Sequence, residues 1–246
     1  MTQTQRVTST KRPLWLNLFG LTTLVLFGVG MYLGLVVSQP DANQGDLFRI
    51  TYAHVSTVWV CFLASTVAAV FGMLYLWRGK TMDDIHAVAH TESALVFALL
   101  TISVGMIYSK PTLGVFWDWD PRLTLTALLF ALLVGYFIVR GLIDDPIRRG
   151  RVSAVVSIII LASLPFNYMA TVWFRTLHPS KSFEVTASGV RDTMDPTFRW
   201  ILLFNVAVAA LIYAWFVLER VRIGRLEAKL QEVQTEPKVK GEVIHV

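Results

Sequence analysis

The chain has 246 residues, of which 54% are hydrophobic and only 16% charged, and its mean hydropathy is +0.56. Soluble domains carry about 25% charged residues, so this composition excludes an ordinary soluble protein. The formal net charge is +5, but the basic residues lie beside the ends of apolar runs, which argues against nucleic-acid binding.

Six apolar runs are long enough to cross a membrane as helices, since about 20 helical residues span roughly 30 Å of hydrocarbon. The first run is too long for a signal peptide and lacks a cleavage site of small residues. Pro165 predicts a kink in the fifth run, where neighbouring helices would satisfy the freed backbone groups. We predict an all-α, polytopic membrane protein with six transmembrane helices, at Leu14–Val37, Val55–Trp77, Glu92–Tyr108, Leu123–Val139, Val152–Phe174 and Trp200–Leu218.

The distribution of Lys and Arg predicts the orientation of these helices. With both termini in the cytoplasm, 15 of the 22 basic residues fall on the inner side and 7 on the outer side, as the positive-inside rule requires. Residues 1–218 would form one membrane domain, followed by a charged cytoplasmic tail, 219–246, that is first helical and then disordered. The outer segments are Ser38–His54, Ser109–Arg122 and Arg175–Arg199.

Two features of the chain argue against particular functions: ATP hydrolysis, and disulfide exchange or covalent haem attachment. Gly79-Lys80-Thr81 resembles the end of a phosphate-binding loop, but the preceding glycine, Gly72, is too far upstream and lies in a predicted span. We therefore expect that the chain does not hydrolyse ATP itself. The single cysteine, Cys61, is predicted to be a small buried residue, and the chain has no CxxC or CxxCH motif for disulfide exchange or covalent haem.

The predicted topology places two of the five histidines on the outer side of the membrane and three on the inner side. His54, at the start of the second span, and His178, just after the fifth, fall on the outer side. His86 and His90 fall on the inner side one helical turn apart; a solvated helix face is the preferred interpretation over a metal site, because little nearby completes a ligand set. His245 lies in the tail.

The segment 116–120 is the most unusual part of the sequence, because two Trp and one Phe alternate with two Asp and are followed by Arg122. Flat aromatic side chains suit a planar ligand, and a guanidinium binds carboxylates in a bidentate fork. Histidines on the same face could serve as axial ligands of haem iron. The residues alone leave two interpretations open: a haem-binding surface, and an interfacial belt of membrane-anchoring aromatic residues.

Three motifs in register resemble one known family. Gly114–Thr124 is similar to the tryptophan-rich signature of haem-handling proteins, and the context resembles the branch called cytochrome c maturation protein C, the haem-exporter C subunit. Tyr52–Val55 is similar to that family's Tyr-x-His-Val, and Trp173–His178 to its Trp-Trp-x-Thr-Leu-His. The resemblance extends to about Leu218 and does not cover the tail.

The resemblance implies a haem site on the outer side of the membrane. His54 and His178 match the family's axial ligands of the haem iron. The residues that match the haem platform and chaperone-docking surface are Gly114, Phe116, Trp117, Trp119, Asp120 and Arg122.

The chain departs from the family pattern at four positions. Leu113 stands where the first Trp is usual, and Phe116 replaces a Trp or Tyr. Pro121 lies inside the signature, and Ser56 replaces the usual Pro after His-Val. These departures put in doubt how the first ring position contributes.

The resemblance further implies a non-enzymatic, haem-binding subunit of the cytochrome c maturation system in the cell inner membrane. It would hold non-covalent haem b facing the periplasm and present it to a membrane-anchored haem chaperone. It would act in an ABC-type haem export complex with an ATPase, membrane subunits, a small single-span accessory subunit and lipids, and without nucleic acid. A contact between Arg122 and a haem propionate is our own hypothesis.

Two alternatives come from other functional classes. An electron-transferring subunit similar to cytochrome b would need histidine pairs inside the spans. A small-solute permease would need ionisable residues there. The interiors of the predicted spans contain neither.

Overall fold

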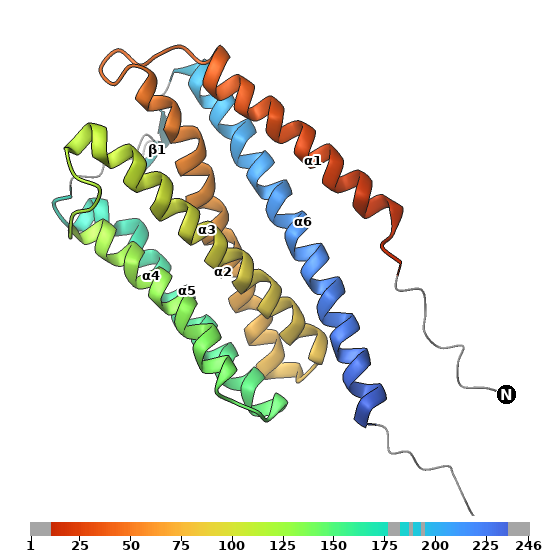
Figure 1. Cartoon of the computed structure of the whole chain (residues 1–246). Coiled ribbons are helices and arrows are strands. Elements are labelled where there is room, and N and C mark those ends of the chain that lie inside the picture. Colours follow the sequence, from red (N-terminus) through yellow and green to blue (C-terminus); the bar gives the residue numbers. More distant parts are fainter. Residues whose placement is uncertain (1–10, 177–182, 187–188, 193–194, 236–246) are drawn as a thin grey trace, which may run out of the picture.

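The computed structural model describes residues 11–176, 183–186, 189–192 and 195–235. Within them, six helices are long and apolar enough to cross a membrane (Figure 1), which confirms the all-α fold class and the six predicted spans. The elements are α1 (Leu14–Tyr32), which continues as the π-helical turn η2 (Leu33–Val37), the 3-10 turn η3 (Asp46–Arg49), α2 (Ile50–Arg78), α3 (Thr81–Leu113), α4 (Pro121–Gly141), α5 (Pro146–Trp173), the strands β1 (Phe183–Thr186) and β2 (Gly189–Asp192), and α6 (Pro196–Thr235).

The helices run up and down, so their connections gather at two ends of the bundle (Figure 1). We call the end that holds residues 38–49 and 114–120 the aromatic end. The end that holds residues 79–80 and 142–145 is the tail end. The arrangement agrees with a multi-pass membrane protein, and the placement of the tail end in the cytoplasm remains a prediction.

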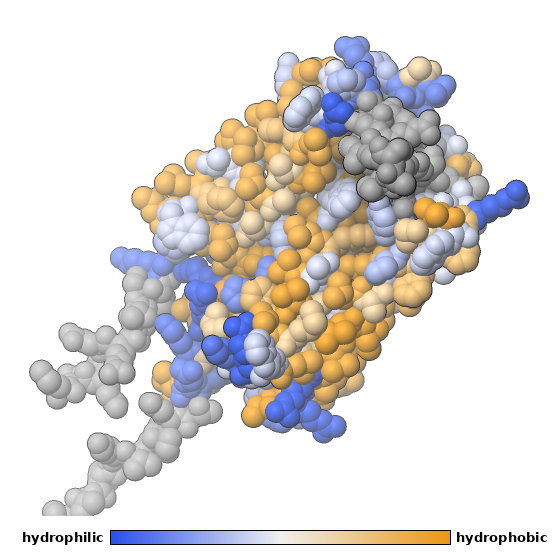
Figure 2. Space-filling view, turned by 180° about the vertical axis from the view of Figure 1, so that it is seen from behind, coloured by the Kyte–Doolittle hydropathy of each residue, from blue (hydrophilic) through white to orange (hydrophobic). Residues whose placement is uncertain are grey.

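Helices α2, α3, α4 and α5 form the centre of the bundle, α6 packs against α2 and α3, and α1 packs on the outside of α6. Small residues let the central helices approach closely, and a Cβ atom at Gly150 would lie 2.5 Å from the ring of Tyr75. Cys61 is 2% exposed, which confirms its predicted burial. Figure 2 shows hydrophobic side chains across the middle of the molecule and hydrophilic ones toward its ends, as membrane burial requires.

Helix α3 begins earlier than the sequence analysis predicted, at Thr81 rather than Glu92. Gly79 ends α2 in a left-handed conformation (φ 64°), so only residues 79–80 separate α2 from α3. The segment predicted as an inner loop is therefore the first part of a membrane-spanning helix.

This extension corrects the prediction of a solvated face for His86 and His90. His90 is only 8% exposed, and its Nδ1 lies 2.6 Å from the hydroxyl of Tyr213 on α6. The His86 ring stacks on Phe71 of α2 with centroids 4.6 Å apart. The prediction was wrong because α3 packs between α2 and α6 at this level, and it also placed these histidines outside the spans.

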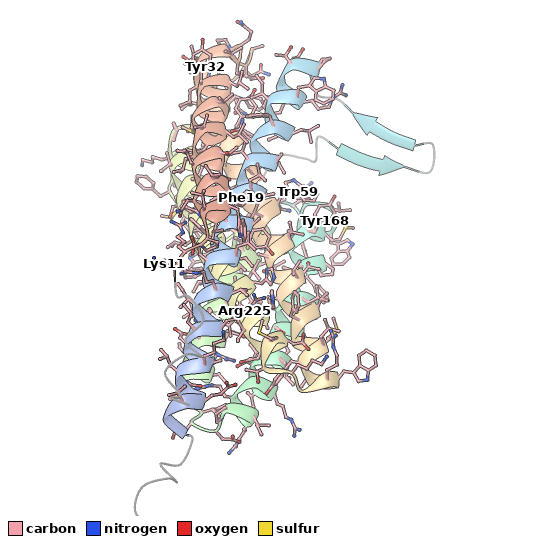
Figure 3. All side chains as sticks on the ribbon, turned by 90° about the vertical axis from the view of Figure 1, so that its right-hand side faces the viewer. Lys11, Phe19, Tyr32, Trp59, Tyr168 and Arg225 are labelled. Carbon is pink, nitrogen blue, oxygen red and sulfur yellow. The ribbon has the colours of Figure 1, made fainter. Side chains whose placement is uncertain are left out.

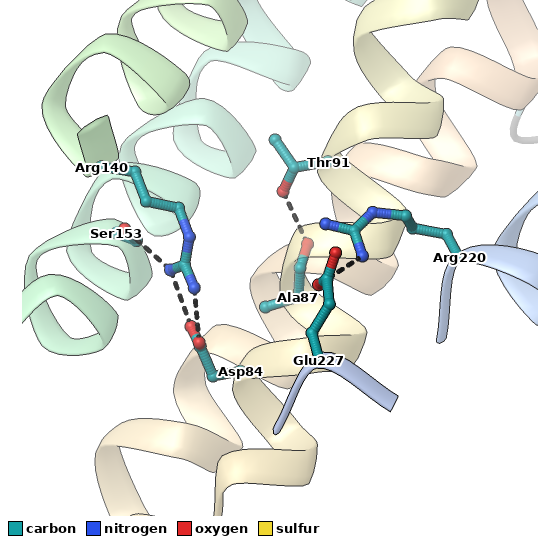
Figure 4. Close-up of polar contacts among 7 residues, drawn as sticks. All are labelled: Asp84, Ala87, Thr91, Arg140, Ser153, Arg220 and Glu227. Carbon is teal, nitrogen blue, oxygen red and sulfur yellow. Dashed lines mark hydrogen bonds and ion pairs between the residues drawn. The ribbon is translucent and has the colours of Figure 1, made fainter. Parts of the chain in front are cut away.

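Polar contacts join the helices near the tail end (Figure 4). Arg140 on α4 donates to both carboxylate oxygens of Asp84 on α3, at 2.9 and 2.6 Å, and to the hydroxyl of Ser153 on α5 at 3.2 Å. Ionisable groups thus lie within the helices near their ends, and there they bind one another. The predicted absence of ionisable residues holds only for the shorter predicted spans.

Two further features concern the last third of the chain. Helix α5 continues through Pro165 to Trp173. Strands β1 and β2 pair as an antiparallel hairpin that lies to the side of the bundle (Figure 3), an element the sequence analysis did not predict. Helix α6 runs without interruption to Thr235, and residues 236–246 lie outside the described part.

Candidate functional site at the aromatic end

The aromatic loop, residues 114–120, begins where α3 ends. Gly114 adopts a left-handed conformation (φ 80°), which stops the helix and which residues with a side chain rarely adopt. Lys110 donates from Nζ to the carbonyl oxygen of Gly114 at 2.9 Å, and its Nζ lies 5.2 Å from the ring centroid of Phe116. The last turn of α3 therefore holds the start of the loop by a hydrogen bond and a cation–π contact.

The rings of the loop form an apolar surface that is open to a ligand. Trp117 and Trp119 pack edge to face, with ring centroids 5.6 Å apart and planes at 78°. Trp119 is 74% exposed and Phe116 54% exposed, whereas Trp117 is half-buried. Trp117 is thus the most buried of the three rings, and Phe116 and Trp119 are open to solvent.

Asp120 connects the loop to two other elements. Its Oδ1 accepts a hydrogen bond from the backbone N–H of Leu123 at 2.8 Å, so Asp120 is the N-cap of α4, with Pro121 at the first helical position. Its Oδ2 accepts a hydrogen bond from the hydroxyl of Thr176, just after α5. One carboxylate, 9% exposed, therefore fixes both the start of α4 and the chain beyond α5.

Arg122 extends from the first turn of α4 toward α5. Its Nη1 donates to the carbonyl oxygen of Asn167 at 3.3 Å and lies 3.5 Å from that of Tyr168. The Asn167 side chain in turn donates to the hydroxyl of Thr126 at 3.1 Å. Arg122 thus joins α4 to α5 beneath the loop.

His54 lies at the same end, near the start of α2, and is half-buried. Its carbonyl oxygen accepts a hydrogen bond from the hydroxyl of Thr57 at 2.8 Å. Its ring packs against the backbone of α3 at Gly105.

A groove of about 440 Å³ adjoins the loop between α4 and α5. It is lined by Trp119, by the first turns of α4, and by Phe166, Trp173 and Phe174 from the side of α5. None of these last three rings was among the predicted site residues. Phe166 and Trp173 pack at 6.0 Å on the exposed face of α5. Their spacing of seven residues places them on one helical face, a signal that could have been recognised from the sequence.

The structure thus brings the loop residues and Arg122 together, with His54 on a neighbouring helix at the same end. His54, Phe116 and Trp117 do not line the groove. The other predicted axial ligand, His178, lies outside the described residues. Among the described residues there is no group of three or more His, Cys, Asp or Glu side chains that could hold a metal ion.

Comparison with known families decides the relationship. The family described as heme exporter protein C matches residues 1–236. The chain belongs to this family. The family predicted from the three motifs is thereby confirmed.

Curated members of the family are similar over most of their length. Heme exporter protein C of Haemophilus influenzae is 29% identical over 211 residues, which cover 85% of this chain and 84% of the relative. Heme exporter protein C of Bradyrhizobium diazoefficiens is 26% identical over 214 residues, 86% of this chain and 79% of the relative. That of Escherichia coli K12 is 28% identical over 205 residues, 82% and 80% respectively.

Proposed function

We propose that this heme exporter protein C family member holds haem at the aromatic end, with His54 and His178 as axial ligands of the iron. The platform comprises the loop from Gly114 to Asp120 together with Arg122. The haem is non-covalent haem b, which the protein carries as cargo and presents to a membrane-anchored haem chaperone. The protein binds and positions haem, and a partner performs the covalent step.

One observation carries the proposal: the hydrogen bond between Asp120 and Thr176. It joins the aromatic loop to the segment that leads to His178, two residues further along the chain. His54 lies on α2 at the same end of the bundle. The chain is therefore bonded to the loop two residues before one proposed ligand, and the other proposed ligand lies at the same end of the bundle.

The residues at the aromatic end suit haem in chemistry. The open groove beside the loop has an apolar and aromatic lining, and the exposed Trp119 is part of it. Phe116, also exposed, lies in the same loop. Histidine is a standard axial ligand of haem iron. Bound haem would supply an iron centre whose ligands these segments orient.

The orientation and the partners belong to the same proposal. The positive-inside rule places the aromatic end in the periplasm and the tail end in the cytoplasm of the cell inner membrane. The ATP-hydrolysing subunit of an ABC-type complex is then another chain, which agrees with the absence of a phosphate-binding loop in this sequence. Further membrane subunits and a small single-span accessory subunit complete the proposed complex.

Absorption spectroscopy of the purified full-length protein tests the ligand assignment. We expect His54→Ala and His178→Ala each to shift the Soret band and to lower the ratio of haem to protein. His245→Ala, in the tail, is the matched control and should behave as the wild type. If the spectra and haem content of all three variants equal those of the wild type, the two histidines are not the ligands.

A further inference from the structure

Gly105 on α3 faces the ring of His54 on α2. A Cβ atom built at Gly105 would lie 3.0 Å from Cε1 of His54, 3.5 Å from Nδ1 and 4.0 Å from Nε2. Such a contact to Cε1 is shorter than van der Waals packing allows without a shift of the ring. A side chain at residue 105 would therefore require the imidazole to shift by a few tenths of an ångström.

The glycine is otherwise unfavourable at this position. It lies inside α3, away from both helix ends, where glycine is a poor helix former. Gly135, inside α4, provides the comparison, because a Cβ atom there would meet nothing within 4 Å. The two glycines differ in what they face, and only Gly105 faces a proposed ligand.

The three distances also describe how the ring is turned. Measured from the Cβ position of Gly105, Cε1 is the nearest of these ring atoms, and Nε2 lies 0.5 Å further away than Nδ1. A side chain at residue 105 would therefore crowd Nε2 less than Nδ1. A small displacement of the ring by a new methyl group would move this atom directly.

We propose that Gly105 is a positioning residue for His54: the absence of a side chain at this position lets the imidazole lie against α3, with Nε2 as the ring nitrogen further from residue 105. This inference rests on the proposed function, in which His54 ligates haem iron. In this proposal Gly105 acts through His54. Its role is to fix the place of the ligand relative to the aromatic loop.

The test compares Gly105→Ala and Gly105→Val with Gly135→Ala as the matched control. We expect Gly105→Ala to shift the Soret band and the reduction potential of the bound haem and to lower haem content several-fold. Gly105→Val should do so more strongly. Gly135→Ala should match the wild type in all three measurements. In haem-free protein, the ¹⁵N resonances of His54 should move in Gly105→Ala and stay in place in Gly135→Ala.

Adding Gly105→Ala to His54→Ala separates positioning from general destabilisation. We expect the double variant to equal His54→Ala in haem content and spectrum, because the positioned ring is gone. A further loss in the double variant would overturn the positioning role and indicate a structural one. If His54→Ala alters the haem spectrum and the Gly105 variants do not, this inference fails while the proposed function stands. A wild-type spectrum for His54→Ala would instead overturn the proposed ligand and this inference with it.

Discussion

The carboxylate of Asp120 accepts a hydrogen bond from the hydroxyl of Thr176, and the same carboxylate caps α4 through the N–H of Leu123. A single side chain thus joins three parts of the aromatic end: the loop, the first turn of α4 and the segment after α5. The two functions of Asp120 can be separated by mutation, because the cap uses Oδ1 and the link to Thr176 uses Oδ2.

Asp120→Ala removes both the helix cap and the link. Loss of an N-cap costs about 1 kcal/mol of stability, so we expect a lower melting temperature together with lower haem retention. Thr176→Val removes only the link; it should lower haem retention and accelerate amide hydrogen exchange in residues 115–119 with a smaller change in melting temperature. An equal loss of stability in both variants would show that the link, rather than the cap, stabilises this end.

The ion pair between Arg140 and Asp84 predicts a larger effect at the tail end. Each side chain is only 17% exposed, so Asp84→Asn leaves a half-buried guanidinium without its counter-charge. Breaking such a pair costs about 3–5 kcal/mol when buried. We expect a clear decrease in melting temperature in detergent.

The matched control for this pair is Asp46→Asn. Asp46 lies 3.1 Å from Arg49 and is 74% exposed, and exposed ion pairs contribute no more than about 1 kcal/mol. Comparable losses of stability in the two variants would contradict the assignment of Arg140 and Asp84 as a stabilising contact between α3 and α4.

The six spans and the position of the aromatic loop could be predicted from the sequence because both depend on local properties. Apolar runs determine the helices. Gly114 and Asp120, which end α3 and begin α4, belong to residue types that favour helix ends. The sequence therefore contained the boundaries of the loop as well as its aromatic composition.

The burial of His90 and the role proposed for Gly105 could not be predicted, because both depend on contacts between distant segments. Tyr213, the partner of His90, is 123 residues away in the chain. Gly105 and Gly135 are both single glycines in apolar runs, and only the packing of α2 against α3 distinguishes them. The early start of α3 was missed for a similar reason: its first turn carries Asp83 and Asp84, whose charges pair with Arg78 of α2 and Arg140 of α4.

The contact between His90 and Tyr213 predicts that Tyr213 stabilises the fold and that its substitution does not change haem binding. Tyr213→Phe removes the hydroxyl that lies 2.6 Å from Nδ1 of His90, and an unsatisfied buried polar group costs about 1–3 kcal/mol. We expect lower stability in thermal unfolding and unchanged haem content. Tyr32→Phe, whose side chain is 58% exposed, is the control and should be near neutral. A change in the haem spectrum of Tyr213→Phe would contradict the assignment of haem to the opposite end.

Substitutions of Arg122 test whether a haem propionate binds to its guanidinium at the base of the loop. In the structure its Nη1 donates to the carbonyl oxygen of Asn167, which leaves other N–H groups of the fork to bind a propionate. Arg122→Leu should therefore lower haem retention and also weaken the contact between α4 and α5.

Arg122→Lys keeps the charge but loses the bidentate fork, so we expect an intermediate haem content if a propionate is bound in this way. Haem-to-protein ratios measured on purified variants, with melting temperatures alongside, separate the two effects. An unchanged haem content in Arg122→Leu would exclude the propionate contact and leave Arg122 as a residue that joins α4 to α5.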